Sequence, residues 1–229
     1  MLIIVDKKIP VEAKNNLEAY GQLMELETSG ITYEAISGHP DIFFHQAAKQ
    51  VIVAPNLPET YKQQLKEAGI DFVSGEQDVG DKYPASCAYN AVSTKSFLIH
   101  NFRNTDAIIT STLEDADLIH VDQGYTRCNL LALDDDHFIS SDAGIGRVLE
   151  RFEKECLYVS PEAIQLDGFK HGFFGGCCGV FNKKVFILGS LKHHPDGNRI
   201  KEYLEAKECN IIELFDGPLF DGGSILILD

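Results

Sequence analysis

Short segments rich in apolar residues recur along the chain at a nearly constant interval. They occupy residues 2–5, 50–53, 96–99, 137–140 and 185–188. Their length and their β-branched and aromatic content are typical of buried strands. Because consecutive segments begin 41 to 48 residues apart, we predict five copies of one supersecondary unit.

A helical pattern follows each of these strands, and two further strands complete the unit. The predicted helices span residues 10–20, 58–68, 104–116, 144–155 and 195–209. The predicted second strands span residues 23–27, 71–74, 117–122, 156–160 and 210–215. The predicted third strands span residues 41–46, 85–90, 128–134, 177–182 and 223–228. Each unit therefore has the order strand–helix–strand–strand.

None of these units can bury its apolar faces alone, so each must pack against its neighbours. A ring of five units meets this requirement and places the last strand, 223–228, beside the first, 2–5. We therefore predict an α/β fold, a five-fold pseudosymmetric α/β propeller. It forms a single domain, residues 1–229, with units that begin near residues 2, 50, 96, 137 and 185. The alternative is an irregular α/β sheet in which the spacing is coincidental.

The charge balance narrows the possible partners. The 20 Lys and Arg residues and 35 Asp and Glu residues give a net charge of −15, and no dense basic patch interrupts it, so we expect no nucleic-acid binding. No run approaches the ~20 apolar residues of a membrane helix, and the N-terminal run lacks signal-peptide features. We therefore expect a cytoplasmic protein with no membrane association. The six cysteines lack metal-type spacing, so we predict reduced thiols, no metal and no cofactor.

Unusual polar residues collect in the loops that precede the predicted third strands. These loops are His39-Pro40-Asp41, Tyr83-Pro84, Gly124–Arg127, His171–Gly176 and Asp216–Gly222. Equivalent loops of a ring point toward one axis, so these side chains should converge on a small-molecule site. Pro40 fixes the backbone, and on an extended segment His39 and Asp41 share a face. A turn with a capping aspartate is the alternative interpretation.

Four stretches of the sequence resemble the pentein, or guanidine-modifying-enzyme, superfamily. They are Gly38-His39-Pro40-Asp41, Gln123-Gly124-Tyr125-Thr126-Arg127-Cys128, Gly175-Gly176-Cys177-Cys178-Gly179 and Asp221-Gly222-Gly223-Ser224. The superfamily includes arginine deiminases, agmatine deiminases, dimethylarginine dimethylaminohydrolases and amidinotransferases. The chain is most similar to a bacterial family of uncharacterised function within it. The resemblance covers the whole chain and implies a five-unit ring around a small-molecule site.

The resemblance also implies the chemistry of that site. In the enzymes of the superfamily a thiolate attacks a guanidinium carbon, a histidine transfers protons and carboxylates hold the cation. The expected partner is therefore a small guanidino-type cation, which suits the acidic charge balance. We expect Cys128, His39 and His171 to be catalytic, and we expect Arg127 to lower the pKa of Cys128 if the two approach. The expected substrate-binding residues are Asp41, Asn90, Gln123, Tyr125, Arg127, Gly176 and Asp221.

One departure from the superfamily pattern leaves two hypotheses open. In the enzymes the nucleophilic cysteine begins the last strand, whereas this chain has Ser224 there. The first hypothesis is a hydrolase or transferase that uses Cys128, or else Cys177 or Cys178. The second is a non-catalytic binding or interaction module that has lost the catalytic cysteine. Any of these thiols could also be a packed core residue, as cysteine often is.

Overall fold

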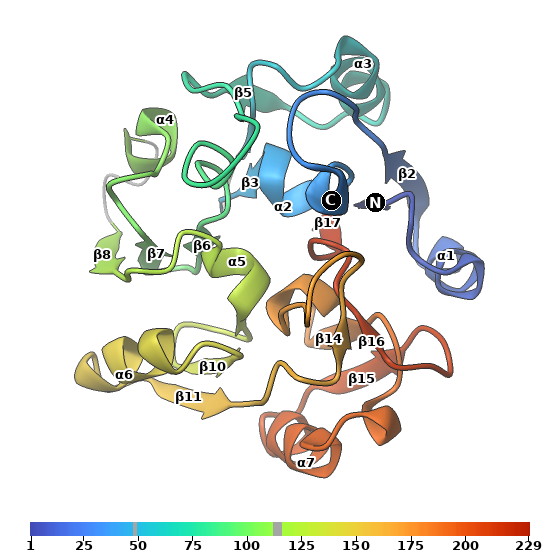
Figure 1. Cartoon of the computed structure of the whole chain (residues 1–229), viewed down its shortest axis with the longest axis vertical. Helices are drawn as coiled ribbons and strands as arrows, with labels where there is room; N and C mark the ends of the chain where they lie inside the picture. Colours follow the sequence, from blue (N-terminus) through green and yellow to red (C-terminus); the bar gives the residue numbers. More distant parts are fainter. Residues whose placement is uncertain (48–49, 112–115) are drawn as a thin grey trace.

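The computed structural model describes residues 1–47, 50–111 and 116–229. The described residues form five three-stranded sheets and one two-stranded sheet. In Figure 1 the three-stranded sheets surround a common centre. Helices α1, α3, α4, α6 and α7 lie at the periphery, and α2 and α5 lie closer to the centre.

Each three-stranded sheet has the same internal order. The central strands are β1 (Leu2–Asp6), β4 (Val51–Val53), β7 (Phe97–His100), β10 (His137–Ser140) and β14 (Lys184–Ile187). Each has a parallel neighbour, namely β2 (Gln22–Leu26), β5 (Phe72–Ser74), β8 (Asp117–His120), β11 (Glu155–Tyr158) and β15 (Asn210–Glu213). Each also has an antiparallel neighbour, namely β17 (Leu226–Leu228), β3 (Phe44–Gln46), β6 (Val92–Ser93), β9 (Leu130–Ala132) and β13 (Cys178–Phe181).

The peripheral helices connect the parallel strands, because a parallel pair requires a crossover connection. They are α1 (Val11–Glu18), α3 (Glu59–Glu67), α4 (Ala107–Ser111), α6 (Ala143–Arg151) and α7 (Gly197–Ala206). Each lies within a helix expected from the sequence or overlaps it to within one residue, although residues 112–115 of the expected third helix lie outside the described residues. Asp142 caps α6 by accepting the backbone N–H groups of Gly144 and Ile145 at 2.6 and 3.1 Å, as an N-cap aspartate does.

The first and last strands meet in one sheet. Strand β17 pairs antiparallel with β1, and Leu2 lies opposite Leu228, so the prediction that segment 223–228 lies beside segment 2–5 is confirmed. All five residues of β1 are buried. Leu2 and Ile4 belong to one hydrophobic cluster, and Ile3 and Val5 belong to another. Because the two faces of β1 bury different clusters, its sequence is apolar without alternation.

The third strands begin later than the sequence pattern predicts. A single helical turn precedes three of them, α2 (Pro40–Phe43), α5 (Thr126–Asn129) and the 3₁₀ turn η2 (Gly175–Cys177). Pro40 occupies the first helical position of α2, where its fixed φ and missing N–H are tolerated. The expected strand 85–90 is wrong, because that segment forms turns and β6 follows at Val92–Ser93. The expectation that His39 and Asp41 share the face of a strand is therefore also wrong.

The remaining short elements are the 3₁₀ turns η1 (Glu34–Ile36) and η3 (Leu191–His193) and the strands β12 (Ile164–Gln165) and β16 (Leu219–Phe220). Strands β12 and β16 pair in parallel. In the part of the chain that the structure describes, no helix has both the length and the apolar character needed to cross a membrane.

Candidate functional site

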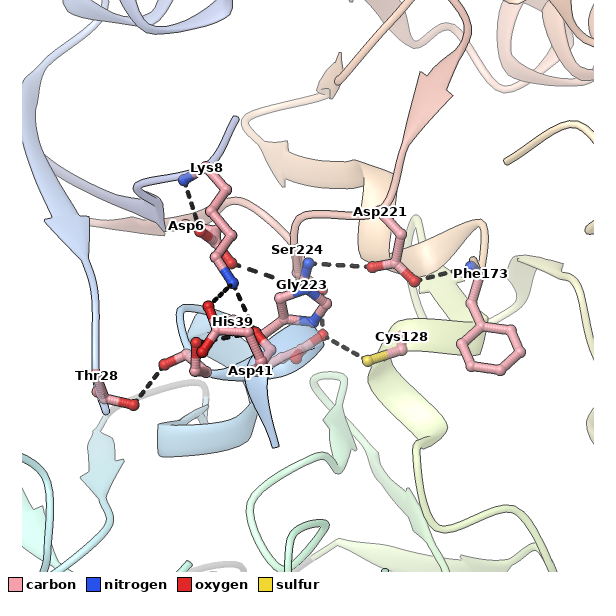
Figure 2. A network of polar contacts seen from close by, with 12 residues as sticks. Asp6, Lys8, Thr28, His39, Asp41, Cys128, Phe173, Asp221, Gly223 and Ser224 are labelled. Carbon is pink, nitrogen blue, oxygen red and sulfur yellow. Dashed lines mark hydrogen bonds and ion pairs between the residues drawn. The ribbon is translucent and has the colours of Figure 1, made fainter. Parts of the chain in front are cut away.

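Polar side chains from distant parts of the chain meet near the centre of the molecule (Figure 2). They come from the end of β1, from α2, from the turn before β6, from α5 and from the loop before β17. We call this group the central polar cluster; its members are Asp6, His39, Asp41, Asn90, Cys128, Asp221 and Ser224. Each is at most 3% exposed. Buried polar groups in proteins are nearly always hydrogen-bonded. The hydrogen bonds among these residues therefore determine the geometry of the site.

Asp41 is the hub of the cluster, in the first turn of α2. Its Oδ2 accepts hydrogen bonds from the Cys128 thiol at 3.1 Å and from the Ser224 hydroxyl at 2.8 Å. Its Oδ1 is buried and has no hydrogen-bond partner. Burial raises the pKa of the Asp41 carboxyl, and these hydrogen bonds offset only part of the increase. The carboxyl therefore presents one free acceptor atom inside the protein.

Cys128 lies in α5 and faces Asp41 (Figure 2). The Asn90 side-chain amide donates to the Cys128 sulfur at 3.3 Å, and the Asn90 Oδ1 accepts the Cys128 backbone N–H at 3.2 Å. Burial and the carboxyl of Asp41 raise the pKa of the Cys128 thiol well above its ordinary value. In the structure as it stands, this sulfur is therefore a neutral thiol at neutral pH.

Arg127 is turned away from the neighbouring thiol. Its guanidinium donates to the backbone carbonyls of Gly175 and Cys178 at 3.1 and 3.2 Å. Burial raises the pKa values of Asp41 and Cys178, and the charge of Arg127 offsets part of each increase. It is not among the main influences on Cys128, so the expectation that Arg127 activates Cys128 is wrong. Its physical role is to join the α5 turn to the η2 turn.

His39 precedes α2 and lies against Gly223. A Cβ on Gly223, where φ is +66°, would lie 2.1 Å from the His39 Cβ, so only glycine allows this approach. The His39 Nδ1 has no hydrogen-bond partner, and its Nε2 lies 3.9 Å from Asp6 Oδ2. Burial lowers the pKa of His39 to about 3, so the ring is neutral and the Asp6 contact is neither an ion pair nor a hydrogen bond.

Asp221 is held by the backbone. Its carboxylate oxygens accept the N–H groups of Phe173 at 2.8 Å and Gly223 at 3.1 Å. A Cβ on Gly176 would lie 1.9 Å from Asp221 Oδ1, so Gly176 makes room for the carboxyl. Burial raises the pKa of Asp221 to about 7, and the nearby charge of Asp41 contributes a smaller part of this increase. The expected site residues Asp41, Asn90, Gly176 and Asp221 thus lie together.

Three other expected site residues make their contacts elsewhere. The half-buried His171 directs Nδ1 to the backbone carbonyl of Gly172 at 3.1 Å. Gln123 stabilises its own loop, since it donates to Asp142 at 3.2 Å and accepts the backbone N–H of Tyr125 at 3.0 Å. The Tyr125 hydroxyl lies 2.5 Å from the Ser86 hydroxyl and 3.2 Å from that of Tyr33.

Asp6 is the site residue that the sequence analysis missed. It ends the buried strand β1, is 1% exposed, and accepts the backbone N–H of Lys8 at 2.7 Å. Burial raises its pKa to about 6. A Cβ on Gly38 would lie 2.6 Å from the Asp6 carboxylate. The available signal was an acidic residue that directly continues a fully apolar strand.

A cavity of about 480 Å³ reaches the central polar cluster. Its wall includes Asp41, Arg127 and Ser224, and also Lys95, Asp134 and Asp135. This volume suits a small molecule. The cluster also contains metal-ligand chemistry, because one ligand-type atom each of His39, Asp41 and Cys128 lies within 4.8 Å of the other two.

Comparisons with solved structures identify the fold. An agmatine deiminase from C. jejuni matches with a TM-score of 0.52 and 9% identity over 93% of this chain and 74% of its own. A DDAH from Pseudomonas aeruginosa, a cysteine-to-serine mutant in complex with citrulline, matches with a TM-score of 0.54 and 10% identity over 93% and 91%. An amidinotransferase of the saxitoxin pathway from Microseira wollei matches with a TM-score of 0.51 and 12% identity over 93% and 87%.

These neighbours are pentein superfamily members, so the predicted resemblance is confirmed at the level of the fold. A comparison with curated proteins finds no match. The matching family model spans residues 4–226 and is described as a family of unknown function, DUF6873. This match covers nearly the whole chain, and the chain therefore belongs to the DUF6873 family.

Proposed function

We propose that the central polar cluster binds a small guanidino or amidino cation that enters through the 480 Å³ cavity. The observation that carries the proposal is a deficit of positive charge. Asp6, Asp41 and Asp221 are buried together, and burial raises the pKa of each. Among the described residues no Lys or Arg is buried, and His39 is neutral. The half-buried Arg127 offsets only part of the increase in the pKa of Asp41. A bound cation would supply the charge that favours ionised carboxylates.

The pentein fold supports the same ligand class. One of the structural neighbours is described in complex with citrulline, whose uncharged ureido group has the planar shape of a guanidino group, and an agmatine deiminase from C. jejuni is described with substrate bound. We further propose that the five three-stranded sheets are the blades of one five-fold pseudosymmetric propeller in a single domain, residues 1–229. The shared strand order of the sheets and their arrangement around a centre support this. In such a propeller the cluster lies on the axis.

Cys128 is the proposed nucleophile of a hydrolase or transferase. Its thiol already donates to Asp41 Oδ2 at 3.1 Å, which is the distance required between a nucleophile and its base. A cation beside the sulfur would lower the thiol pKa, so the proton could pass to Asp41. The thiolate would then bond to the amidine carbon, and a carbon–nitrogen bond would break as the departing amine takes a proton. Water or a second amine would cleave the carbon–sulfur bond.

His39 and His171 are the proposed proton carriers in these steps. The unpartnered Nδ1 of His39 can accept or deliver a proton inside the cluster. His171 stands farther along the chain, next to Phe173, whose N–H holds Asp221. Gln123 and Tyr125 would act by holding the loop that leads into α5.

A non-catalytic binding protein is the second candidate function. Two observations favour it: Ser224 occupies the place of the superfamily cysteine, and burial raises the pKa of the Cys128 thiol well above its ordinary value. On this hypothesis Asp41 and Asp221 still hold the cation, but no bond to sulfur forms.

One experiment separates these possibilities. Arginine, agmatine and methylarginines are titrated calorimetrically into chelator-treated protein, and release of ammonia, urea or amine is followed in parallel. Binding that Asp41→Asn abolishes supports the cation site, and turnover that Cys128→Ala removes supports catalysis. Cys209→Ala is the matched control, because this thiol is only half-buried and donates to the backbone carbonyl of Lys207. The absence of any binding would refute the proposed function.

A further inference from the structure

Two buried polar atoms in the central polar cluster have no hydrogen-bond partner in the protein. They are Nδ1 of His39 and Oδ1 of Asp41, and both residues are 2% exposed. A buried polar atom without a hydrogen bond is destabilising, and such atoms are rare in folded proteins. Both residues also offer a ligand-type atom within 4.8 Å of the Cys128 sulfur, so together the three residues indicate a site for a bound ion.

We propose that His39, Asp41 and Cys128 bind a divalent transition-metal ion, zinc in particular. One nitrogen, one oxygen and one sulfur atom from these residues lie within 4.8 Å of one another. Imidazole, carboxylate and thiolate are the ligands that Zn²⁺ takes in proteins. Three protein ligands leave a fourth tetrahedral position for water or another small ligand, as in catalytic zinc sites.

The surroundings of the three residues match the outer contacts that metal ligands require. A metal-bound imidazole directs its other nitrogen to a carboxylate or carbonyl. The carboxylate of Asp6 lies 3.9 Å from His39 Nε2, so a movement of about 1 Å would bring it to hydrogen-bond distance. The Ser224 hydroxyl orients the Asp41 carboxylate at 2.8 Å, and the Asn90 amide donates to the Cys128 sulfur at 3.3 Å. Asp41 and Cys128 therefore each have a hydrogen-bond partner that holds their orientation, and Asp6 is placed to become one for His39.

The backbone also fixes the ligands in place. His39 and Asp41 flank Pro40 at the start of α2, where the Asp41 N–H donates to the Gly223 carbonyl at 3.1 Å. Cys128 lies in α5, where Arg127 N–H donates to the Asn90 carbonyl at 2.9 Å. Main-chain hydrogen bonds thus join α2 to the loop before β17 and α5 to the turn before β6, and each ligand-bearing helical turn is held in place.

This inference does not depend on the proposed guanidino ligand. A metal ion and an organic cation would both use Asp41, so each should weaken the binding of the other. The sequence alone predicts no metal site, because Cys128 belongs to a different unit from His39 and Asp41 and no local spacing connects it to them.

The test uses chelator-treated protein and metal alone, first Co²⁺ and then Zn²⁺ in competition. We expect one equivalent of Co²⁺ to bind, with the near-ultraviolet charge-transfer absorption of a thiolate–cobalt bond, and Zn²⁺ to displace it. Cys128→Ser should abolish that absorption. Asp6→Asn, which leaves the three ligands in place, should weaken Zn²⁺ affinity about 10–100-fold. Cys209→Ser should change neither result, because this cysteine is remote from the three ligands.

Circular dichroism before each titration confirms that the variants are folded, and Asp6→Asn keeps the test informative should Cys128→Ser not fold. Failure of wild-type protein to bind stoichiometric Co²⁺ or Zn²⁺ would overturn the proposal. So would binding that Cys128→Ser and Asp6→Asn leave unchanged. Since no guanidino compound is present, this outcome is independent of the calorimetric test of the proposed function.

Discussion

The effect of Asp221→Asn on the free energy of unfolding should depend on pH. We expect the substitution to destabilise the protein at acidic pH, but not at mildly alkaline pH. Burial raises the pKa of Asp221 from its usual 3.8 to about 7. The folded protein therefore holds this proton more tightly than the unfolded chain does. Below pH 3.8 both states are protonated, and the carboxyl makes no pH-dependent contribution. As the pH rises from there to about 7, the folded state loses stability relative to the unfolded state.

The size of this effect follows from the shift in pKa. From pH 5 to pH 7 the unfolded carboxyl is ionised and the folded one is largely protonated, so each pH unit costs about 1.4 kcal/mol. Wild-type protein should therefore lose up to about 3 kcal/mol through Asp221 between pH 5 and pH 8. In the asparagine variant one carboxylate oxygen is replaced by an amide NH₂ group, which cannot accept a hydrogen bond. One of the two backbone N–H groups, of Phe173 or Gly223, therefore loses its acceptor, which costs about 1–3 kcal/mol at every pH.

Urea unfolding of both proteins at pH 5, 6, 7 and 8 measures the difference directly. We expect Asp221→Asn to be less stable than wild type at pH 5 and equally or more stable at pH 8. The exposed Asp167→Asn is the control, and its curve should run parallel to that of wild type. If the Asp221→Asn and wild-type curves are also parallel from pH 5 to pH 8, the carboxyl does not ionise in this range and the reasoning is refuted.

Three further predictions concern the packing and reactivity of the site. Gly176→Ala should lower the free energy of unfolding by about 1–3 kcal/mol, since its Cβ would lie 1.9 Å from a carboxylate oxygen. Gly146→Ala, inside α6 with its nearest contact at 3.8 Å, should raise it by up to about 1 kcal/mol, and equal effects in urea unfolding would contradict this. Ser224→Ala removes a 2.8 Å hydrogen bond to a buried carboxyl and should cost about 1–2 kcal/mol by the same assay; a neutral result would show the bond to be dispensable. In ligand-free protein, alkylation followed by mass spectrometry should modify Cys209 before Cys128, because Cys128 is 3% exposed and the pKa of its thiol is strongly raised; the reverse order would contradict the raised pKa.

The central strands could be predicted closely because their signal is local. Strand β10 occupies the expected residues 137–140, and β14 differs from its expected range by one residue. An apolar run flanked by turns depends only on neighbouring residues, so the repeat was visible without an alignment. The third strands were misplaced because one helical turn, such as Pro40–Phe43, is too short to show a 3.6-residue period.

The composition of the site could be predicted only in part. His39, Asp41, Cys128 and Asp221 could be predicted as site residues from their positions in or next to the loops before the third strands. The contacts between their atoms could not be predicted. The contact of Asp41 with Cys128 joins residues 87 positions apart, and it depends on how α2 and α5 pack. Asp6 was missed because an acidic residue after a strand ordinarily begins a solvated turn.

The unpartnered atoms of the central polar cluster favour one kind of cation over the other. A planar guanidinium is bound best by a carboxylate that offers both oxygens. Both oxygens of Asp221 already accept backbone N–H groups, and Oδ2 of Asp41 already accepts two hydrogen bonds. The unpartnered atoms are instead single acceptors on two residues, Oδ1 of Asp41 and Nδ1 of His39.

Single acceptors on separate residues suit a metal ion, which takes one lone pair from each ligand. A guanidino ligand would have to share oxygens that are already hydrogen-bonded, or to displace the Ser224 hydroxyl from Asp41. Either arrangement should make Ser224→Ala bind a guanidino compound at least as tightly as wild type does. Zinc affinity should fall in the same variant, because the hydroxyl orients the ligand carboxylate. Opposite changes in the two affinities would show that both cations use Asp41 but through different oxygens.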